Sequence, residues 1–478
     1  MKVLKKYKKM SVEVKASTAY TVCSILVKCL SLITLPIFTR IMTTEEYGLS
    51  TVYASTAAIV VIFTSLRLPY GSLSTAMIKY KNDRIGYLST VCSVSFIFTI
   101  IYFLICVIFK DILVKTLNIP FFLLIFMGIE MLFTSIREAW MGWQRFEYKY
   151  KNVVFVTLVT AFISVILSLI FVLNTEQKAI ARIISNGVVG IVIGIVIFLA
   201  LLKKGRKPFN GVYWRFALSF NIPLIPYYLS QVVFNQSDRL MIDSICGRSD
   251  AAVYGVAYSL ATVLTFIVTS IHSSYTPWIF ERIDKNDIAD NRKVSLILSS
   301  CIAFMLLGII ALTPEIVSVM AGERYISAIW VVPPISMSVL LLYYSDLFDC
   351  ILFFYESKFE LAFAAIISAL INVVLNYIFI PKFGFIAAAY TTLISYLLLA
   401  FIDYLFMIRI CKCHNLDKNI YNINGLIFIF LIFTCLGFMA MFLYNHPFIR
   451  YTIIITVFIF IFIFRSKIIR LFEIVKRK

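Results

Sequence analysis

The chain has 478 residues, of which 61% are hydrophobic and only 14% charged, and its mean hydropathy is +0.93. This balance excludes a soluble domain and predicts an all-α integral membrane protein with many spans. The net charge of +19 would suit nucleic acid. In a membrane protein, however, basic residues first mark cytoplasmic loops and attract anionic lipid, so we expect membrane lipids and no nucleic acid as partners.

The first apolar run, Ala19–Phe38, is long enough to cross a bilayer as a helix. The lysine-rich segment before this run resembles the start of a signal peptide. However, the run is too long and no small-x-small cleavage site follows it, so we interpret it as a retained span. Lys28 lies near its middle, roughly 15 Å from either interface at about 1.5 Å per residue. Pro36 and Thr39-Arg40 follow, and Glu45-Glu46-Tyr47-Gly48 opens the next run.

Apolar runs of this length recur along the chain and predict about fourteen spans in all. We place them near 18–38, 48–66, 85–109, 117–136, 152–173, 180–202, 215–244, 251–279, 294–313, 326–349, 359–380, 384–407, 423–443 and 448–464. The seventh carries Asn221, Pro223, Pro226 and Gln231, a pattern that indicates a broken helix lining a cavity or buried in protein.

A basic hinge, Lys203–Pro208, separates the sixth span from the seventh. We expect an N-terminal six-helix lobe at 1–202, a cytoplasmic linker at 203–214 and a second six-helix lobe at 215–410. Residues 411–478 would add two helices and a basic cytoplasmic tail. Most of the 44 Lys and Arg residues fall in segments that are internal if the amino terminus is cytoplasmic, so both termini are expected inside.

The two predicted lobes share short internal matches in the same order. Ala161–Val172 resembles Ala369–Ile380, Phe146–Lys149 resembles Tyr355–Lys358, and Tyr47-Gly48 recurs as Tyr254-Gly255. A spacing of six spans, an even number, makes the halves parallel repeats. Such repeats enclose a central site that opens alternately to either side, which predicts a transporter.

Charged residues within spans are costly and therefore require an explanation. Lys28 could pair with a carboxylate such as Glu130 to hold helices together, or it could line a water-filled cavity and meet an anionic substrate. Glu130 lies seven residues before Arg137 on one helix face, where we favour a structural pair over a proton site.

Other charged residues lie nearer the predicted interfaces, where anchoring competes with function. Asp238-Arg239 lies at the outer end of the seventh span, and its arginine parallels Arg40 in the repeat. Arg67 and Arg182 end and begin spans, respectively. The last group is acidic: Asp346 and Asp349 could take a coupling ion but, like Asp403, are expected to be exposed at the inner end of their spans.

No enzyme motif, phosphate loop or ATP site is present. Cys411-Lys412-Cys413-His414 lacks the second ligand pair that zinc sites need, so we expect neither a metal nor a cofactor. The ten cysteines lie mostly within apolar runs and give no disulfide framework.

Three motifs resemble the Wzx-type polysaccharide-repeat-unit flippases, in the exporter superfamily that also holds multidrug-and-toxin exporters and the lipid II flippase. They are Leu35-Pro36 to Thr39-Arg40 with Glu45–Gly48, Arg67–Gly71 with Ala76 and Lys79-Tyr80, and Ser237–Arg239 with Ala252–Tyr258. With the span layout, the resemblance covers nearly the whole chain.

The resemblance implies an inner-membrane flippase that moves undecaprenyl-pyrophosphate-linked oligosaccharide to the outer leaflet for O-antigen or capsule synthesis, with a glycan polymerase and a chain-length regulator as further partners. A pyrophosphate needs a cationic interior. The residues that could supply it are Lys28, Arg40, Arg67, Arg137, Arg182 and Arg239.

Two other functions stay open. An ion-coupled multidrug exporter of the same superfamily would use carboxylates, which are also the candidates for ion coupling: Glu130, Asp238, Asp346 and Asp349. A non-transporting scaffold for glycan enzymes is the third hypothesis, although a scaffold has no use for a lysine at mid-membrane.

Overall fold

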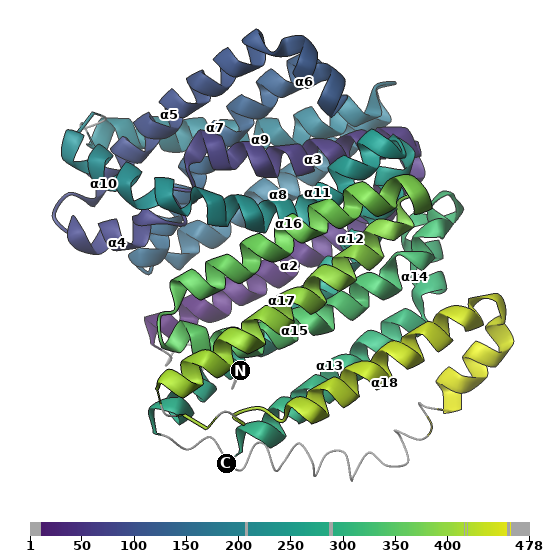
Figure 1. Cartoon of the computed structure of the whole chain (residues 1–478). Helices are drawn as coiled ribbons and strands as arrows, with labels where there is room; N and C mark the ends of the chain where they lie inside the picture. The colour runs from purple at the N-terminus through teal and green to yellow at the C-terminus, as the bar shows by residue number, and fades with distance from the viewer. Residues whose placement is uncertain are drawn as a thin grey trace, which may run out of the picture. The chain divides into compact units, whose positions relative to one another are not determined.

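The computed structural model describes residues 11–205, 209–285, 290–414, 416–417, 419–456 and residue 459. Within these ranges every regular element is a helix (Figure 1), which confirms the all-α prediction. Twelve helices there are long and apolar enough to cross a membrane, so the protein is a multi-pass membrane protein. Contacts divide the chain into two compact units, unit 1 (Met1–Ala252) and unit 2 (Val253–Lys478).

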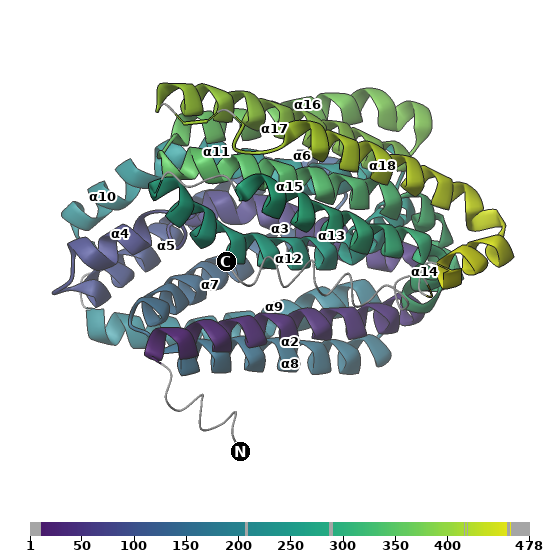
Figure 2. The same ribbon diagram turned by 90° about the horizontal axis from the view of Figure 1, so that it is seen from below.

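Unit 1 is built from helices that follow the predicted spans closely. They are α2 (Val12–Ile41), α3 (Thr44–Ser65), α4 (Ser72–Lys79), α5 (Arg84–Ile108), α6 (Lys110–Leu117), α7 (Phe121–Phe146), α8 (Tyr150–Leu173), α9 (Lys178–Gly205), α10 (Gly211–Asn221) and α11 (Ile225–Ile245). α3, α5 and α9 pack on α7, and α2 runs alongside α8 (Figure 2). The boundary between the two units lies in α12, after Ala252, and not at the basic hinge Lys203–Pro208. The division of the chain into two repeats at that hinge stays a prediction.

Unit 2 contains most of α12 (Arg248–Asp284) and the helices after it. These are α13 (Asn291–Ala311), α14 (Thr313–Ala321), the 3-10 segment η2 (Glu323–Trp330), α15 (Val332–Phe354), α16 (Lys358–Phe383), α17 (Ile386–Cys413), α18 (Ile423–Phe442) and the 3-10 turn η3 (Leu443–Asn445). Its core is formed by α15 and α16, which both pack on α17.

The predicted spans differ from the helices in two places. α7 qualifies as a span only together with α6, across a bend of 92°, because its apolar stretch holds Glu130, Arg137 and Glu138. The fourteenth predicted span begins as a short apolar helix, Pro447–Thr456, and its remainder lies almost entirely outside the described residues. The expected break in the seventh span is confirmed, since the 3-10 turn η1 (Ile222–Leu224) separates α10 from α11 beside Pro223 and Pro226.

The element bounds carry the internal repeat further than the sequence matches do. One constant shift along the chain carries both ends of α9 onto α17, the start of α8 onto α16 and the end of α7 onto α15. The turns after α7 and α15 also correspond. Tyr148 and Glu356 occupy left-handed backbone at φ 53° and 54°. The next amides in the chain, Lys149 and Ser357, donate back to the carbonyls of Gln144 and Leu352, as expected of a Schellman turn.

The polar corner after α2 is a helix start. The Thr43 hydroxyl accepts from the Glu46 amide at 3.2 Å, and the Glu46 carboxylate accepts from the Thr43 amide at 2.8 Å. The first backbone amides of a helix have no hydrogen-bond partner within the helix, and this capping box satisfies some of them. The acidic residues of the Glu45–Gly48 motif therefore include one with a structural role at the start of α3.

Candidate functional site

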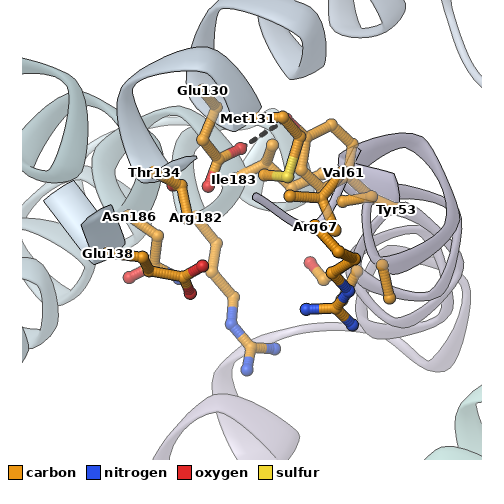
Figure 3. Close-up of a pocket in the computed structure, with 14 residues that line it drawn as sticks. Tyr53, Val61, Arg67, Glu130, Met131, Thr134, Glu138, Arg182, Ile183 and Asn186 are labelled. Atoms are coloured by element: carbon orange, nitrogen blue, oxygen red, sulfur yellow. Dashed lines mark hydrogen bonds between the residues drawn. The ribbon is translucent and has the colours of Figure 1, made fainter. Parts of the chain in front are cut away.

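Unit 1 holds a cavity of about 400 Å³ between α3, α7 and α9 (Figure 3). Its α3 wall is mostly small, with Ala54, Ala57 and Ala58, which leaves room for polar groups from the other helices. The polar and charged residues that line it are Ser50, Tyr53, Arg67, Glu130, Thr134, Glu138, Arg182 and Asn186.

Helical spacing explains why these residues meet. Glu130, Thr134 and Glu138 recur every fourth residue and share one face of α7, while Arg182 and Asn186 do the same on α9. The sequence analysis named Glu130, Arg182 and Arg67 but missed the rest. Steps of four residues onward from Glu130 could have found Thr134 and Glu138.

Glu130 is held by a hydroxyl and not by a cation. The Tyr53 hydroxyl donates to its carboxylate at 2.7 Å, joining α3 to α7 (Figure 3). Among the described residues no ion pair within 4 Å joins Glu130 to Arg137 or to Lys28, so the pair with Arg137 that we expected is wrong and the alternative pair with Lys28 is not formed. Arg137 still acts on Glu130 and Glu138 electrostatically. The Arg137 guanidinium packs closely against Gly190, because a Cβ added at Gly190 would lie 2.7 Å from Arg137 Nη1.

Arg182 is positioned by aromatic rings. Its guanidinium lies over Phe38 at 4.4 Å and over Tyr47 at 4.6 Å, a cation–π arrangement that holds the group without neutralising it. In the described part of the chain, no carboxylate lies within ion-pairing distance of Arg182. The Arg182 guanidinium therefore lines the cavity, and no described carboxylate in direct contact neutralises its charge.

Arg67 is held by an unusual turn. Leu66 and Arg67 have φ of 47° and 51°, a left-handed conformation that costs energy in residues other than glycine. The Arg67 guanidinium lies 5.0 Å over the Tyr70 ring, and its buried Nε has no hydrogen-bond partner within the described part of the chain. In Figure 3 the Arg67 and Arg182 guanidiniums lie on the side of the cavity away from Glu130.

Charge around the cavity is mixed but not balanced. Glu138 lies beside the Tyr70 hydroxyl and within electrostatic reach of Arg137, Arg67 and Arg145. Of the lining residues and Arg137 behind them, three arginines face two glutamates, so the group is net positive. Such a site can hold an anion through bidentate guanidinium contacts, with hydroxyl and amide groups beside it for a polar ligand.

The remaining predicted residues of unit 1 lie away from this lining. The side chain of Lys28 is exposed on α2 and makes no hydrogen bond or ion pair with the described residues, and Arg40 is exposed in the last turn of α2. Arg239 donates to Gln236, whose oxygen also accepts from Ser55 at 3.1 Å. Asp238 is buried on α11.

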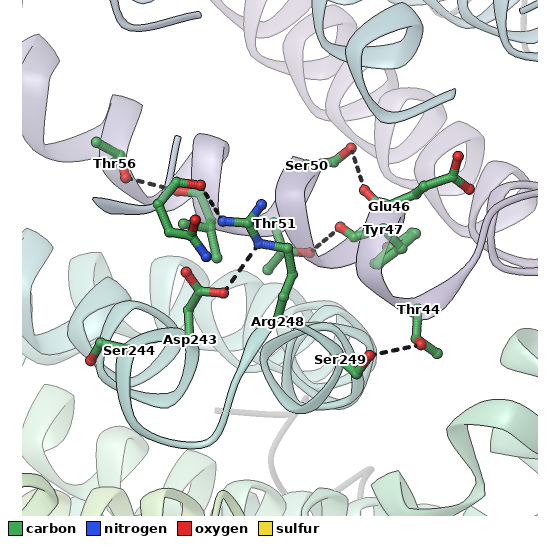
Figure 4. Close-up of polar contacts among 12 residues, drawn as sticks. Thr44, Glu46, Tyr47, Ser50, Thr51, Thr56, Asp243, Ser244, Arg248 and Ser249 are labelled. Atoms are coloured by element: carbon green, nitrogen blue, oxygen red, sulfur yellow. Dashed lines mark hydrogen bonds and ion pairs between the residues drawn. The ribbon is translucent and has the colours of Figure 1, made fainter. Parts of the chain in front are cut away.

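A second polar cluster explains the Tyr47-Gly48 motif (Figure 4). Thr44 and Ser249 are 3.0 Å apart, and Arg248 Nε lies 3.3 Å from Asp243. A Cβ at Gly48 would lie 2.3 Å from the Arg248 carbonyl oxygen. The glycine therefore allows α3 to approach the start of α12 within unit 1.

Unit 2 contains an acidic group. Asp346 and Asp349 lie on α15 and Asp403 on α17, within electrostatic range of one another. Asp403 is 1% exposed and accepts from the Ser345 hydroxyl at 2.5 Å, so its expected exposure is wrong. Asp346 and Asp349 are only partly exposed, and the buried Oδ1 of Asp349 has no hydrogen-bond partner among the residues that the structure describes. The described residues contain no group of three or more metal-ligating side chains suited to a metal ion.

Comparison with known proteins identifies relatives by family and by fold. Residues 14–283 match the family described as "Polysaccharide biosynthesis protein". Among curated proteins no sequence matches significantly.

Solved structures of MATE transporters match most of the chain. An inward-facing multidrug resistance MATE transporter of the MOP superfamily matches with a TM-score of 0.60 and 11% identity, over 81% of this chain and 99% of its own. A MATE structure in the straight conformation gives 0.56 and 12% over 84% and 96%. A mutant of the Vibrio cholerae MATE transporter VcmN gives 0.54 and 10% over 86% and 99%. At these identities the likeness shows a shared fold.

Proposed function

Because the chain belongs to the family of polysaccharide biosynthesis proteins, we propose that it is a flippase that moves undecaprenyl-pyrophosphate-linked oligosaccharide from the cytoplasmic to the outer leaflet. Alternating access of the two repeats would carry the head group across the membrane. The product would feed surface polysaccharide synthesis, and a glycan polymerase and chain-length regulator would act after it.

The observation that carries the proposal is the pair of arginines, Arg67 and Arg182, in the unit 1 cavity. Neither is ion-paired to a carboxylate among the described residues, and both are held by aromatic rings. A pyrophosphate offers the charge that such guanidiniums lack. Thr134, Asn186 and Ser50 beside them supply hydroxyl and amide groups that suit sugars.

The further cations predicted from the sequence, Lys28, Arg40, Arg137 and Arg239, belong to the proposal as secondary contacts. Lys28 is the most informative of these four residues. An exposed charged lysine at mid-span has a high free energy in lipid and a much lower one in a water-filled space. We assign it to the aqueous path of the head group and not to the cavity itself.

Ion coupling is assigned to carboxylates. Asp346 and Asp349, joined by Asp403, have no basic residue within ion-pairing distance among the described residues. Buried carboxylates without a countercharge take up a proton or a cation. Glu130 and Asp238 remain further candidates in unit 1.

An ion-coupled multidrug exporter is the second candidate, and two facts favour it: the MATE fold and the carboxylates Glu130 and Glu138 in the same cavity. An organic cation would bind these acids and be repelled by Arg67 and Arg182. With Arg137 behind the lining counted, three arginines stand against two glutamates, and this excess of positive charge favours an anionic cargo.

The test is depletion of the protein in its host, followed by analysis of lipid-linked glycans and surface polysaccharide. We expect one undecaprenyl-linked repeat unit to accumulate on the cytoplasmic face and surface glycan to be lost. Wild-type protein should restore the glycan, and Arg67→Gln with Arg182→Gln should not. Arg215→Gln, an exposed arginine on α10, is the matched control and should complement fully.

Normal surface glycan after depletion would overturn the flippase. Export of cationic dyes by wild-type vesicles, lost in Glu130→Gln and Glu138→Gln, would then establish the exporter.

A further inference from the structure

Unit 2 contains a groove of about 620 Å³ between α12 and α13, built from residues that the proposed transport site does not use. Its apolar wall is formed by Ile267, Ile271, Val294, Ile297 and Leu298. Ile267 and Ile271 are four residues apart on α12, and Ile297 and Leu298 lie three and four residues after Val294 on α13, so each helix turns one face to the groove.

The groove changes character along its length. From Ile267 to Arg282 on α12 it runs for roughly 20 Å at about 1.5 Å per residue, and its charged groups gather at one end. These are Arg282, Asp290 and Lys293. Trp278 and Tyr275 line the region between the apolar wall and this end, where amphipathic rings are typical of a membrane interface.

The charged end is net positive. Arg282 Nη1 lies 3.8 Å from Asp290 Oδ2, and its guanidinium lies 5.3 Å over the Trp278 ring. Lys293 is exposed and forms no ion pair with any described residue. By the distribution of Lys and Arg, this end of both helices is predicted to face the cytoplasm.

We propose that this groove binds one anionic glycerophospholipid of the cytoplasmic leaflet. Its phosphate lies against Lys293 and Arg282, and one acyl chain lies along the apolar wall. A free phosphate would leave that wall unused, while a zwitterionic lipid would bring its own cation toward Lys293. The site is independent of the cargo and of the proposed transport function.

Trp278 makes the groove observable by fluorescence. The full-length protein is reconstituted with phosphatidylglycerol or phosphatidylcholine whose acyl chains carry bromine, which quenches nearby tryptophan. The Trp278 signal is the difference between wild type and Trp278→Phe. We expect brominated phosphatidylglycerol to quench it at about fivefold lower mole fraction than brominated phosphatidylcholine, the effect of one basic residue near the surface.

Lys293→Gln should remove this preference: the mole fraction of brominated phosphatidylglycerol needed for the same quenching should rise about fivefold. Lys285→Gln is the matched control. It also removes one positive charge, directly after the end of α12 that carries Arg282, but Lys285 pairs with Glu281 at 2.5 Å and does not line the groove. We expect Lys285→Gln to keep the wild-type preference.

Equal quenching of wild-type Trp278 by the two lipids would overturn the proposal. So would an equal loss of preference in Lys285→Gln and Lys293→Gln, because it would indicate general surface attraction. Displacement of brominated phosphatidylglycerol by an equal mole fraction of polyprenyl phosphate would assign the groove to the carrier lipid instead.

Discussion

At the scale of single residues, the contact between Tyr53 and Glu130 joins two helices across the cavity. Tyr53→Phe keeps the ring but leaves a carboxylate without its donor at 2.7 Å. Such an orphaned group costs about 1–3 kcal/mol. We expect a lower denaturation midpoint for the purified protein in detergent, and a smaller loss in Glu130→Gln because its amide can still accept.

The double variant tests whether the contact is the cause. If the hydroxyl and carboxylate act as a pair, Tyr53→Phe should cost little once Glu130 is Gln, and the effects should fall short of additive. Additive losses would show that each residue stabilises the protein through other neighbours.

The limit of prediction from sequence is also visible at this scale. Depth in the membrane can be read from position along a span, and this is how Lys28, Glu130 and Arg182 were found. Which way a side chain faces depends on packing, and Lys28 is exposed on α2 while Arg182 lines a cavity. Asp403 was misread because distance from a span end does not report burial by α15.

At the scale of helices, Gly48 fixes how closely α3 approaches the start of α12. Gly48→Ala would place a methyl group 2.3 Å from the Arg248 carbonyl oxygen, against backbone that cannot rotate away. Overpacking of this kind costs roughly 1–3 kcal/mol. We expect less folded protein in the membrane and a lower denaturation midpoint in detergent.

Gly308→Ala is the matched control, since a Cβ there, in the last turn of α13, meets nothing within 4 Å. Removing a helix-interior glycine should leave stability unchanged or raise it by up to about 1 kcal/mol. A similar loss in both variants would refute the role assigned to the contact.

The helices themselves were largely predictable, because apolar length and proline position determine spans and breaks. The repeat was predicted from weak apolar matches and is strengthened by features that sequence does not display. Tyr148 and Glu356 share no chemistry, yet both occupy left-handed turns at corresponding positions. The bend between α6 and α7 was not foreseen, since a short helix and a span look alike as one hydrophobic run.

At the scale of the whole molecule, the distribution of charge predicts orientation. Single cysteines placed in a cysteine-free variant can test it. Glu176→Cys lies between α8 and α9 and Lys285→Cys follows α12. We expect an impermeant maleimide to label Glu176→Cys in intact cells, and Lys285→Cys only after permeabilisation. The reverse pattern would invert the topology and move the lipid groove to the outer leaflet.

The two units also differ in the charges that corresponding helices carry. The shift that carries α9 onto α17 places Ser345 where unit 1 has Arg137, and Asp346 where it has Glu138. In unit 1, Arg137 acts electrostatically on Glu130 and Glu138, and Arg67 and Arg182 add further positive charge to the same cavity. In unit 2 the carboxylate of Asp403 has a serine hydroxyl as its partner, and neutralisation requires a proton or a cation.

This asymmetry predicts a division of work, with anion binding in unit 1 and ion coupling in unit 2. In proteoliposomes with lipid-linked substrate, Asp349→Asn and Asp403→Asn should each lower transport driven by a proton or sodium gradient by roughly tenfold, within the usual range of coupling energies. Substrate exchange without a gradient should continue, because the unit 1 cavity is intact. Asp284→Asn, an exposed carboxylate at the end of α12, should respond to the gradient as wild type does. Equal loss of driven transport and exchange would instead mean that these aspartates maintain the fold, since an amide would then disturb packing that both reactions need.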